Sequence, residues 1–280
     1  MKKIIVLAAV FLLAGCSTKF AYNNISWLVY WYIDDYVEFN KDQKIMFDDY
    51  IASWQSWHKQ SELPKYQAHL EELASDIATQ NISIDRMAYH QDKARDHWHR
   101  ARAHVAPGLV ELAKTLDEEQ ITFFFAALEK ENVEDEEEWL ERQERSEKRR
   151  KDDWIDRNFD NLEDYLGRLT TEQKDFVRNS YGNFESTRMH WIKYKRDYQQ
   201  AMRQAFVMED RGEQFENTML ELATNPEVFR SEDMLAASDR NEEKTKEFLL
   251  TVFSLSTDKQ RQHFIRELND LRDDMIDLSE

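Results

Sequence analysis

The chain has 280 residues, a formal net charge of −18 and a mean hydropathy of −0.81, with 41% hydrophobic and 34% charged residues. This acidic balance argues against a nucleic-acid-binding protein, which needs a basic footprint. With 5 glycines and 3 prolines, the chain has few sites for tight turns, which argues against a β-rich fold.

The first fifteen residues have the pattern of a secretory signal peptide. Two lysines precede an apolar run over residues 4–13, which is too short to span a bilayer. The run ends in the letters LAGC, whose cysteine, Cys16, is the only one in the chain. This stretch resembles the lipobox of bacterial lipoproteins. The resemblance implies a signal peptide at 1–15 and a lipidated Cys16 as the first mature residue.

The residue after the cysteine bears on where such a lipoprotein is sorted. In that class of proteins an aspartate there signals retention in the inner membrane, and here the position holds Ser17. The resemblance therefore implies the periplasmic face of the outer membrane. We expect a lipidated tether over 16–24 and an all-helical periplasmic domain over 25–280. A lone cysteine leaves no intramolecular disulfide and no cysteine-based metal site.

An aromatic segment follows the anchor. Eight of the twenty residues from 20 to 39 are aromatic, and no charge appears between Lys19 and Asp34. One interpretation is a helix lying in the membrane interface, where Trp and Tyr rings are favoured. The other is a first helix buried against later ones. The sequence favours burial, because the run lacks the charged face of an interfacial helix.

One helix-capping pattern occurs four times. Each copy has a capping residue, at least one acidic residue in the first helical turn and a glutamine at the third helical position. The pairs of cap and glutamine are Asn40 and Gln43, Asp117 and Gln120, Thr170 and Gln173, and Thr257 and Gln260. This is capping-box chemistry, in which the two side chains satisfy each other's free backbone N–H groups. It predicts helices beginning near 41, 118, 171 and 258, and sub-repeats starting near 40, 117, 170 and 257.

Other residues mark further helix ends. Ser83 is a cap, Pro64 breaks the second helix, Pro107 kinks or splits the helix that Ser83 begins, and Gly167 ends a helix. Residues 129–151 combine an acidic run with Glu-to-Arg/Lys pairs at helical spacing, so we expect a continuous, largely solvated helix there. The whole pattern predicts an all-α fold, as an elongated bundle or a repeat-like array of helical hairpins with long helices.

Three histidines recur every seven residues on one predicted helix: His90, His97 and His104. Seven residues rise by about 10.5 Å, so no two of them can bind one ion, and a metal site would need ligands from another helix. No nucleophile, phosphate-binding or dinucleotide-binding motif is present. We therefore expect no catalytic residue, no cofactor and no enzymatic activity.

Two short motifs resemble known families. The letters LTTEQ at 169–173 are similar to the LTxxQ motif of the Spy/CpxP family, all-helical periplasmic proteins tied to envelope stress and protein folding. The letters FAYNN at 20–24, directly after the lipobox and followed by the Trp/Tyr-rich stretch, resemble a family of uncharacterised bacterial envelope lipoproteins. The second resemblance covers nearly the whole mature chain and implies no known activity.

These observations lead to three functional hypotheses. The first is a non-catalytic module that binds or scaffolds envelope proteins, with the membrane contacted through Cys16 and a protein partner in the envelope. The second is a chaperone-like or stress-linked role. The third, a metal-dependent enzyme, would depend on the histidines. The acidic charge leaves no role for nucleic acid.

Overall fold

We describe a computed structural model of the chain, covering residues 16–208 and 210–279. The predicted signal peptide at 1–15 lies outside these residues. The described part is built from α-helices with short π and 3₁₀ turns and contains no β-strand, so the predicted all-α class is confirmed. None of its helices is both long enough and apolar enough to cross a membrane.

Among the described residues, the first half of the chain forms five α-helices and a π turn before the charged middle. They are α2 (Cys16–Asn23), α3 (Ile25–Ile33), α4 (Lys41–Trp57), the π turn η1 (His58–Glu62), α5 (Leu63–Thr79) and α6 (Ile84–Lys114). The expected tether at 16–24 is therefore helical, and its Tyr22 is buried. Pro64 lies in the first turn of α5, where its missing N–H costs nothing.

The second half continues with seven α-helices and one 3₁₀ turn. They are α7 (Glu118–Glu144), α8 (Glu147–Leu166), α9 (Thr171–Asn179), α10 (Arg188–Phe206), α11 (Glu213–Thr224), η2 (Pro226–Phe229), α12 (Glu232–Ser254) and α13 (Asp258–Ser279). Gly167 ends α8 with a positive φ of 67°, as predicted for a helix C-terminus. Ser83 caps α6 as predicted.

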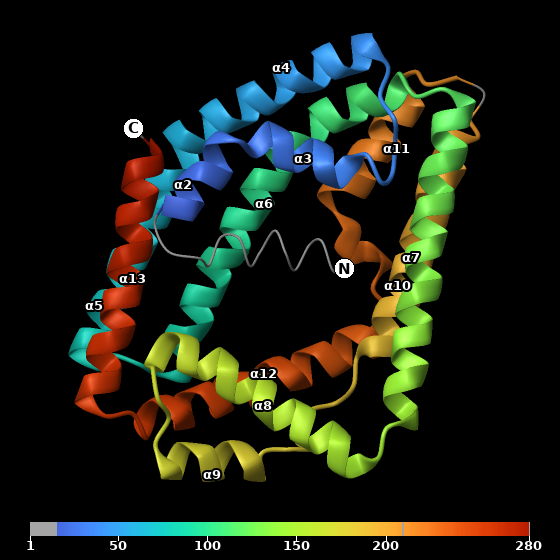
Figure 1. Cartoon of the computed structure of the whole chain (residues 1–280). Helices are drawn as coiled ribbons and strands as arrows, with labels where there is room; N and C mark the ends of the chain where they lie inside the picture. The colour runs from blue at the N-terminus through green and yellow to red at the C-terminus, as the bar shows by residue number, and fades with distance from the viewer. Residues whose placement is uncertain (1–15, 209, 280) are drawn as a thin grey trace.

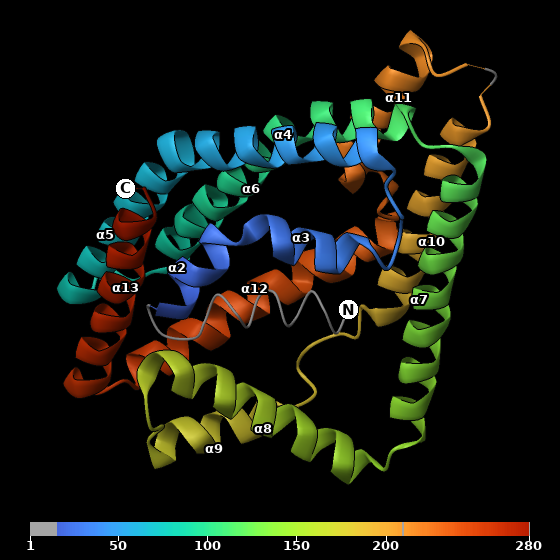
Figure 2. The same cartoon turned by 45° about the horizontal axis from the view of Figure 1, so that its top comes forward.

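The helices form the sides of a four-sided frame (Figure 1). α5 packs along α13 on one side, and α7 packs along α10 on the opposite side. α4 and α11 lie along the upper edge, α6 rises from the lower left to that edge, and α8, α9 and α12 lie along the lower edge. Figure 2 shows α2 and α3 beside α4, on the inner side of the upper edge.

The four predicted capping boxes are confirmed, and they meet in two pairs. At the upper right corner of Figure 1 the boxes of α4 and α7 are joined by two hydrogen bonds between Gln43 and Gln120, of 2.8 and 2.9 Å. At the diagonally opposite corner the boxes of α9 and α13 are joined by Gln260 donating to Gln173 at 2.9 Å.

Each glutamine also bonds to the backbone of the neighbouring segment. Gln43 donates to the carbonyl of Thr115, and Gln260 donates to that of Arg168. All four glutamine side chains are buried. A motif that looks purely local in the sequence therefore also fixes two corners of the tertiary structure.

The helix that Ser83 begins is neither split nor ended by its proline. α6 runs continuously through Pro107, and at the next residue, Gly108, it lies close to α4. A Cβ on Gly108 would lie 2.8 Å from the Trp54 ring and 3.0 Å from the Tyr50 ring. The glycine is there because α4 and α6 cross at that point with no space for a side chain.

The charged middle differs from our prediction. The expected continuous helix over 129–151 is broken, because α7 ends at Glu144 and α8 starts afresh with Ser146 as its cap. The acidic part is not a solvated arm either. Asn132 and Asp135 are buried against α10, where Arg188 donates to Asp135 at 2.8 Å. The basic residues of α10 provide the partners for the acidic run, and the sequence alone did not reveal this pairing.

Candidate functional site

Three histidines form a hydrogen-bonded chain between α5 and α6. His69 on α5 lies between His90 and His97 on α6. Its Nε2 is 3.0 Å from Nδ1 of His90, and its Nδ1 is 3.2 Å from Nε2 of His97. His69 supplies the contribution from a second helix that the sequence analysis lacked.

The two ends of this chain fix the proton on every ring. Arg100 can only donate, so Nδ1 of His97 accepts and its Nε2 carries the hydrogen. His97 then donates to His69, which donates through Nε2 to His90. The last ring donates from Nε2 to the carboxylate of Asp76 at 2.8 Å. The chain therefore runs in one direction, from a cation to an anion, through three neutral rings.

The surroundings of His69 and His97 disfavour the charged forms of these two rings. Burial, together with the neighbouring His90 and His97, lowers the pKa of His69 to about 4. Burial and the nearby Arg100 also lower the pKa of His97. All six ring nitrogens of the three histidines already have protein partners. The described residues contain no group of three or more His, Cys, Asp or Glu side chains arranged to hold a metal ion.

A buried carboxylate lies beside the cationic end of the chain. Glu62, which is 0% exposed, closes the π turn η1 and accepts from Arg100 at 2.9 and 3.0 Å and from Lys65. Burial opposes its ionisation, but these two cations outweigh burial and hold the pKa of the Glu62 carboxyl below its usual range. The extra residue of a π turn is frequent at functional sites, and here it places this carboxylate inside.

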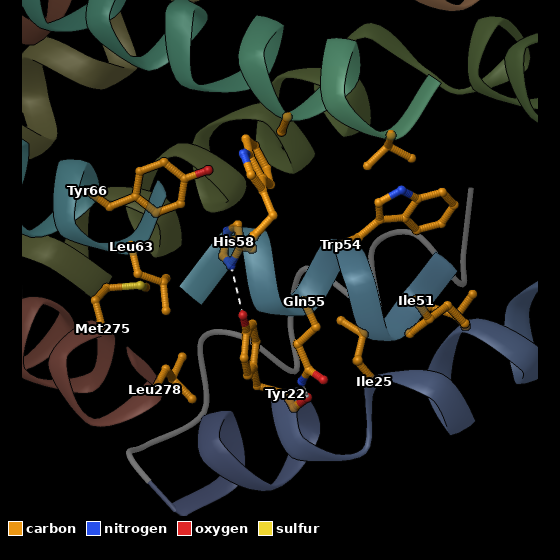
Figure 3. Close-up of a pocket in the computed structure, with 14 residues that line it drawn as sticks. Tyr22, Ile25, Ile51, Trp54, Gln55, His58, Leu63, Tyr66, Met275 and Leu278 are labelled. Atoms are coloured by element: carbon orange, nitrogen blue, oxygen red, sulfur yellow. Dashed lines mark hydrogen bonds between the residues drawn. The ribbon is translucent and has the colours of Figure 1, made fainter. Parts of the chain in front are cut away.

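An apolar cavity of about 460 Å³ lies next to this network. Its walls come from α2, α3, α4, α5, α6 and α13, and Figure 3 shows their side chains converging on it. Tyr66 belongs to both features, because it lines the cavity and its ring packs edge-on against His97, with centroids 4.6 Å apart.

Two hydrogen bonds engage polar groups of the cavity wall. The Tyr22 hydroxyl is 2.9 Å from Nδ1 of His58, and Gln55 donates to the Tyr22 carbonyl at 2.8 Å (Figure 3). Burial lowers the pKa of His58 and, with the nearby Tyr66, raises the pKa of Tyr22 to about 12. The wall therefore presents rings and methyl groups to its interior.

The helices α2 and α3 have two different faces. Tyr22, Ile25 and Val29 point into the cavity wall. The opposite stripe exposes large rings, with Phe20 67% and Trp27 64% exposed, and Trp31 lies on the same stripe. Phe20 lies on α2, and Trp27 and Trp31, four residues apart, share one face of α3. The predicted burial therefore holds for one face, and the interfacial interpretation of the exposed face stays a prediction.

The predicted candidate residues lie in three places. Cys16 begins α2, next to the aromatic face. His90 and His97 belong to the histidine chain. His104 does not, because its ring stacks on Trp57 with centroids 4.0 Å apart. The sequence analysis missed His69, since a single histidine on α5 gives no signal until α5 and α6 are placed side by side.

Comparison with known proteins identifies a family but no characterised relative. A model of a family of unknown function, DUF6279, matches residues 35–234. No curated protein and no solved structure matches the chain. Because the matched region covers well over half of the sequence, the chain belongs to the DUF6279 family of unknown function.

Proposed function

We propose that this protein is a lipid-anchored, non-catalytic binding module on the periplasmic face of the outer membrane. The observation that carries the proposal is the exposed aromatic face of α2 and α3, which begins four residues after Cys16. Interfacial Trp and Phe rings favour the boundary between headgroups and acyl chains. A lipid on Cys16 would hold this face at that boundary.

The charge of the molecule supports the same orientation. The chain carries a net charge of −18, which opposes electrostatic adhesion of the rest of the body to anionic lipids. Attachment through acyl chains and aromatic rings needs no basic patch. The α2–α3 face is therefore the part of the molecule suited to contact a membrane, and the remaining sides of the frame are free to bind an envelope partner.

We assign binding rather than catalysis because the titratable side chains of the network are already paired. The histidine chain ends on Arg100 and Asp76, and Glu62 is held by two cations. A general acid or base must reach the proton that it transfers, and these groups instead face one another. The network rigidifies the α5–α6 pair.

The anchor is tested by fractionation of cells that express the full chain. We expect the wild-type protein in the outer membrane and the Cys16→Ala variant as an uncleaved or mislocalised precursor, because a stable anchor needs more than one acyl chain. A Cys16→Ala protein that still fractionates as mature outer-membrane protein would contradict the anchor.

The aromatic face is tested separately on the mature chain, residues 16–280, carrying Cys16→Ser, so that neither a lipid nor the signal peptide contributes. Trp27→Ser should reduce its co-sedimentation with vesicles of phosphatidylethanolamine and phosphatidylglycerol. The matched control is Trp98→Ser on α6, where the ring is 63% exposed but far along the chain from the anchor. Equal loss in both variants, or no loss in either, would count against a role for the α2–α3 face.

A further inference from the structure

We propose that the apolar cavity between α2–α3, α4, α5, α6 and α13 binds one long acyl chain. Its volume of about 460 Å³ falls in the range of about 300–1,000 Å³ found for small-molecule sites. A closely packed protein interior leaves few spaces larger than a water molecule, so a cavity of this size is a feature to be explained.

The chemistry of the wall selects an apolar ligand. Two hydrogen bonds already engage part of the polar lining: the Tyr22 hydroxyl pairs with Nδ1 of His58, and Gln55 donates to the Tyr22 carbonyl. Apart from the Tyr66 hydroxyl and the indole N–H groups of Trp54 and Trp57, the rest of the lining is aliphatic and aromatic surface, including Ala101 and Val105 from α6. A ligand group that forms hydrogen bonds to water would lose those bonds on entering and find few replacements in this lining. The bound part is therefore a hydrocarbon.

The shape of the cavity favours a chain over a compact group. Its lining residues on α4 and at the start of η1 run from Ile51 to His58, which is about 10 Å along the helix axis. Figure 3 shows Trp54 and Ile51 toward one end and Tyr66, Met275 and Leu278 toward the other. An extended acyl chain fits such a space, and its headgroup stays outside.

The position of the cavity indicates the source of the acyl chain. Tyr22 in the wall lies six residues after Cys16 on the same helix, a rise of about 9 Å. Two sources share this chemistry: a membrane lipid, and the acyl group attached to Cys16 itself. Only this choice of source depends on the proposed anchoring; binding in the cavity is a separate property of the fold.

The test uses the mature chain, residues 16–280, with Cys16→Ser and the fluorescent fatty acid cis-parinaric acid. We expect saturable binding with energy transfer from tryptophan, because Trp54 and Trp57 line the cavity. Trp54→Phe should lower this transfer while the protein still binds the probe. The matched control is Trp98→Phe, which removes an exposed tryptophan of α6 that is not among the lining residues.

A second variant fills the cavity. Ala101→Trp should weaken binding by about tenfold or more, the loss expected from displacing about two methylene groups. Ala94→Trp is its control, because Ala94 is exposed and lies two turns earlier on the same face of α6. Thermal melting of each variant shows whether it is folded. If Ala101→Trp is not folded, the energy transfer measured with Trp54→Phe decides whether the probe binds in the cavity.

The outcomes separate the two sources and the two proposals. If the Cys16→Ser variant binds the probe and the lipidated wild-type protein does not, the cavity holds the protein's own acyl chain. If both proteins bind the probe, the cavity takes a membrane lipid. Absence of saturable binding to Cys16→Ser overturns the proposal, as does unchanged binding by a folded Ala101→Trp. Neither result alters the fractionation that tests the anchor.

Discussion

At the scale of single residues, the most informative side chains are polar and buried. The glutamines of the capping boxes and the histidines of the α5–α6 chain all have complete sets of partners. A buried polar group that loses its partner costs about 1–3 kcal/mol, so each of these networks is sensitive to removal of one member. The first two predictions exploit this sensitivity.

Removing one glutamine of the second pair should destabilise the fold by about 1–3 kcal/mol, because its partner is left unsatisfied in a buried site. Gln173→Ala and Gln260→Ala should each show this loss of unfolding free energy in urea. The double variant should lose less than the sum, since the two side chains bond to each other.

The control pair for this cycle is Gln43→Ala with Gln260→Ala. These two glutamines belong to opposite corners of the frame and share no partner. Their costs should therefore add. Additive costs within the second pair would show that the contact between Gln173 and Gln260 contributes no coupling.

The histidine chain predicts a pH dependence of stability. The pKa of His69 is lowered to about 4 in the fold, against about 6.5 when unfolded. Below pH 6.5 the unfolded chain takes up a proton that the folded protein does not, so stability falls as the pH is lowered from about 6.5 towards 4. Between pH 7 and pH 5 we expect His69 to account for about 1–2 kcal/mol of lost unfolding free energy.

Urea unfolding at pH 7 and pH 5 measures this loss. His69→Asn should reduce it, because the variant has no proton to gain at that position. His99→Asn, an exposed histidine on α6, is the control and should leave the pH dependence as in the wild type. A His69→Asn protein with the full wild-type loss would show that other groups cause the effect.

At the scale of helices, charge complementarity decides where the acidic middle of the chain lies. Arg196 on α10 bonds to Glu136 at 2.8 Å and to Glu129 at 2.9 Å, both on α7. Asp135 of α7 is buried between Arg188 and Lys195 of α10. The exposed ion pairs contribute little each, whereas the buried carboxylate is costly to leave unpaired or to remove.

We therefore predict that Asp135→Ala destabilises the protein by about 2–3 kcal/mol. This is below the ~3–5 kcal/mol of a fully buried pair, because both cations retain partial access to water. Glu137→Ala, at an exposed position two residues later, should change stability by no more than about 0.5 kcal/mol. Similar losses of unfolding free energy in both variants would indicate that the buried carboxylate contributes no more to stability than an exposed one.

The helix starts could be predicted from the sequence because capping is local chemistry. Asn40, Asp117, Thr170 and Thr257 each act within three residues, and each caps its helix as expected. The contacts between side chains of different helices were not predicted. Whether His69 meets His90 is decided by how α5 packs on α6, and neither propensity nor spacing reports that.

At the scale of the whole molecule, the frame closes through its last helix. α13 lies along α5, and its Leu268 is buried with Ala74 and Ile77. Met275 and Leu278 from the same helix complete one end of the cavity. The C-terminal segment therefore covers the apolar stripe of a helix from the first third of the chain and closes the cavity wall.

Removing α13 should consequently affect far more than its own residues. We predict that a chain ending at Ser256 loses protection from amide exchange throughout α5, because the apolar stripe of α5 has lost its cover. Adding a peptide of residues 257–280 should restore part of that protection. A truncated protein whose α5 remains as protected as in the full chain would contradict the dependence.

The uncharged glutamine pairs make the frame respond unevenly to ionic strength. An amide neither titrates nor carries net charge, so the two diagonal corners hold their geometry in concentrated salt. The α7–α10 side is joined by ion pairs whose exposed members are screened when the Debye length shrinks to about 3 Å at 1 M salt. In concentrated salt we therefore expect the corners to keep their hydrogen bonds while the exposed ion pairs of the α7–α10 side weaken.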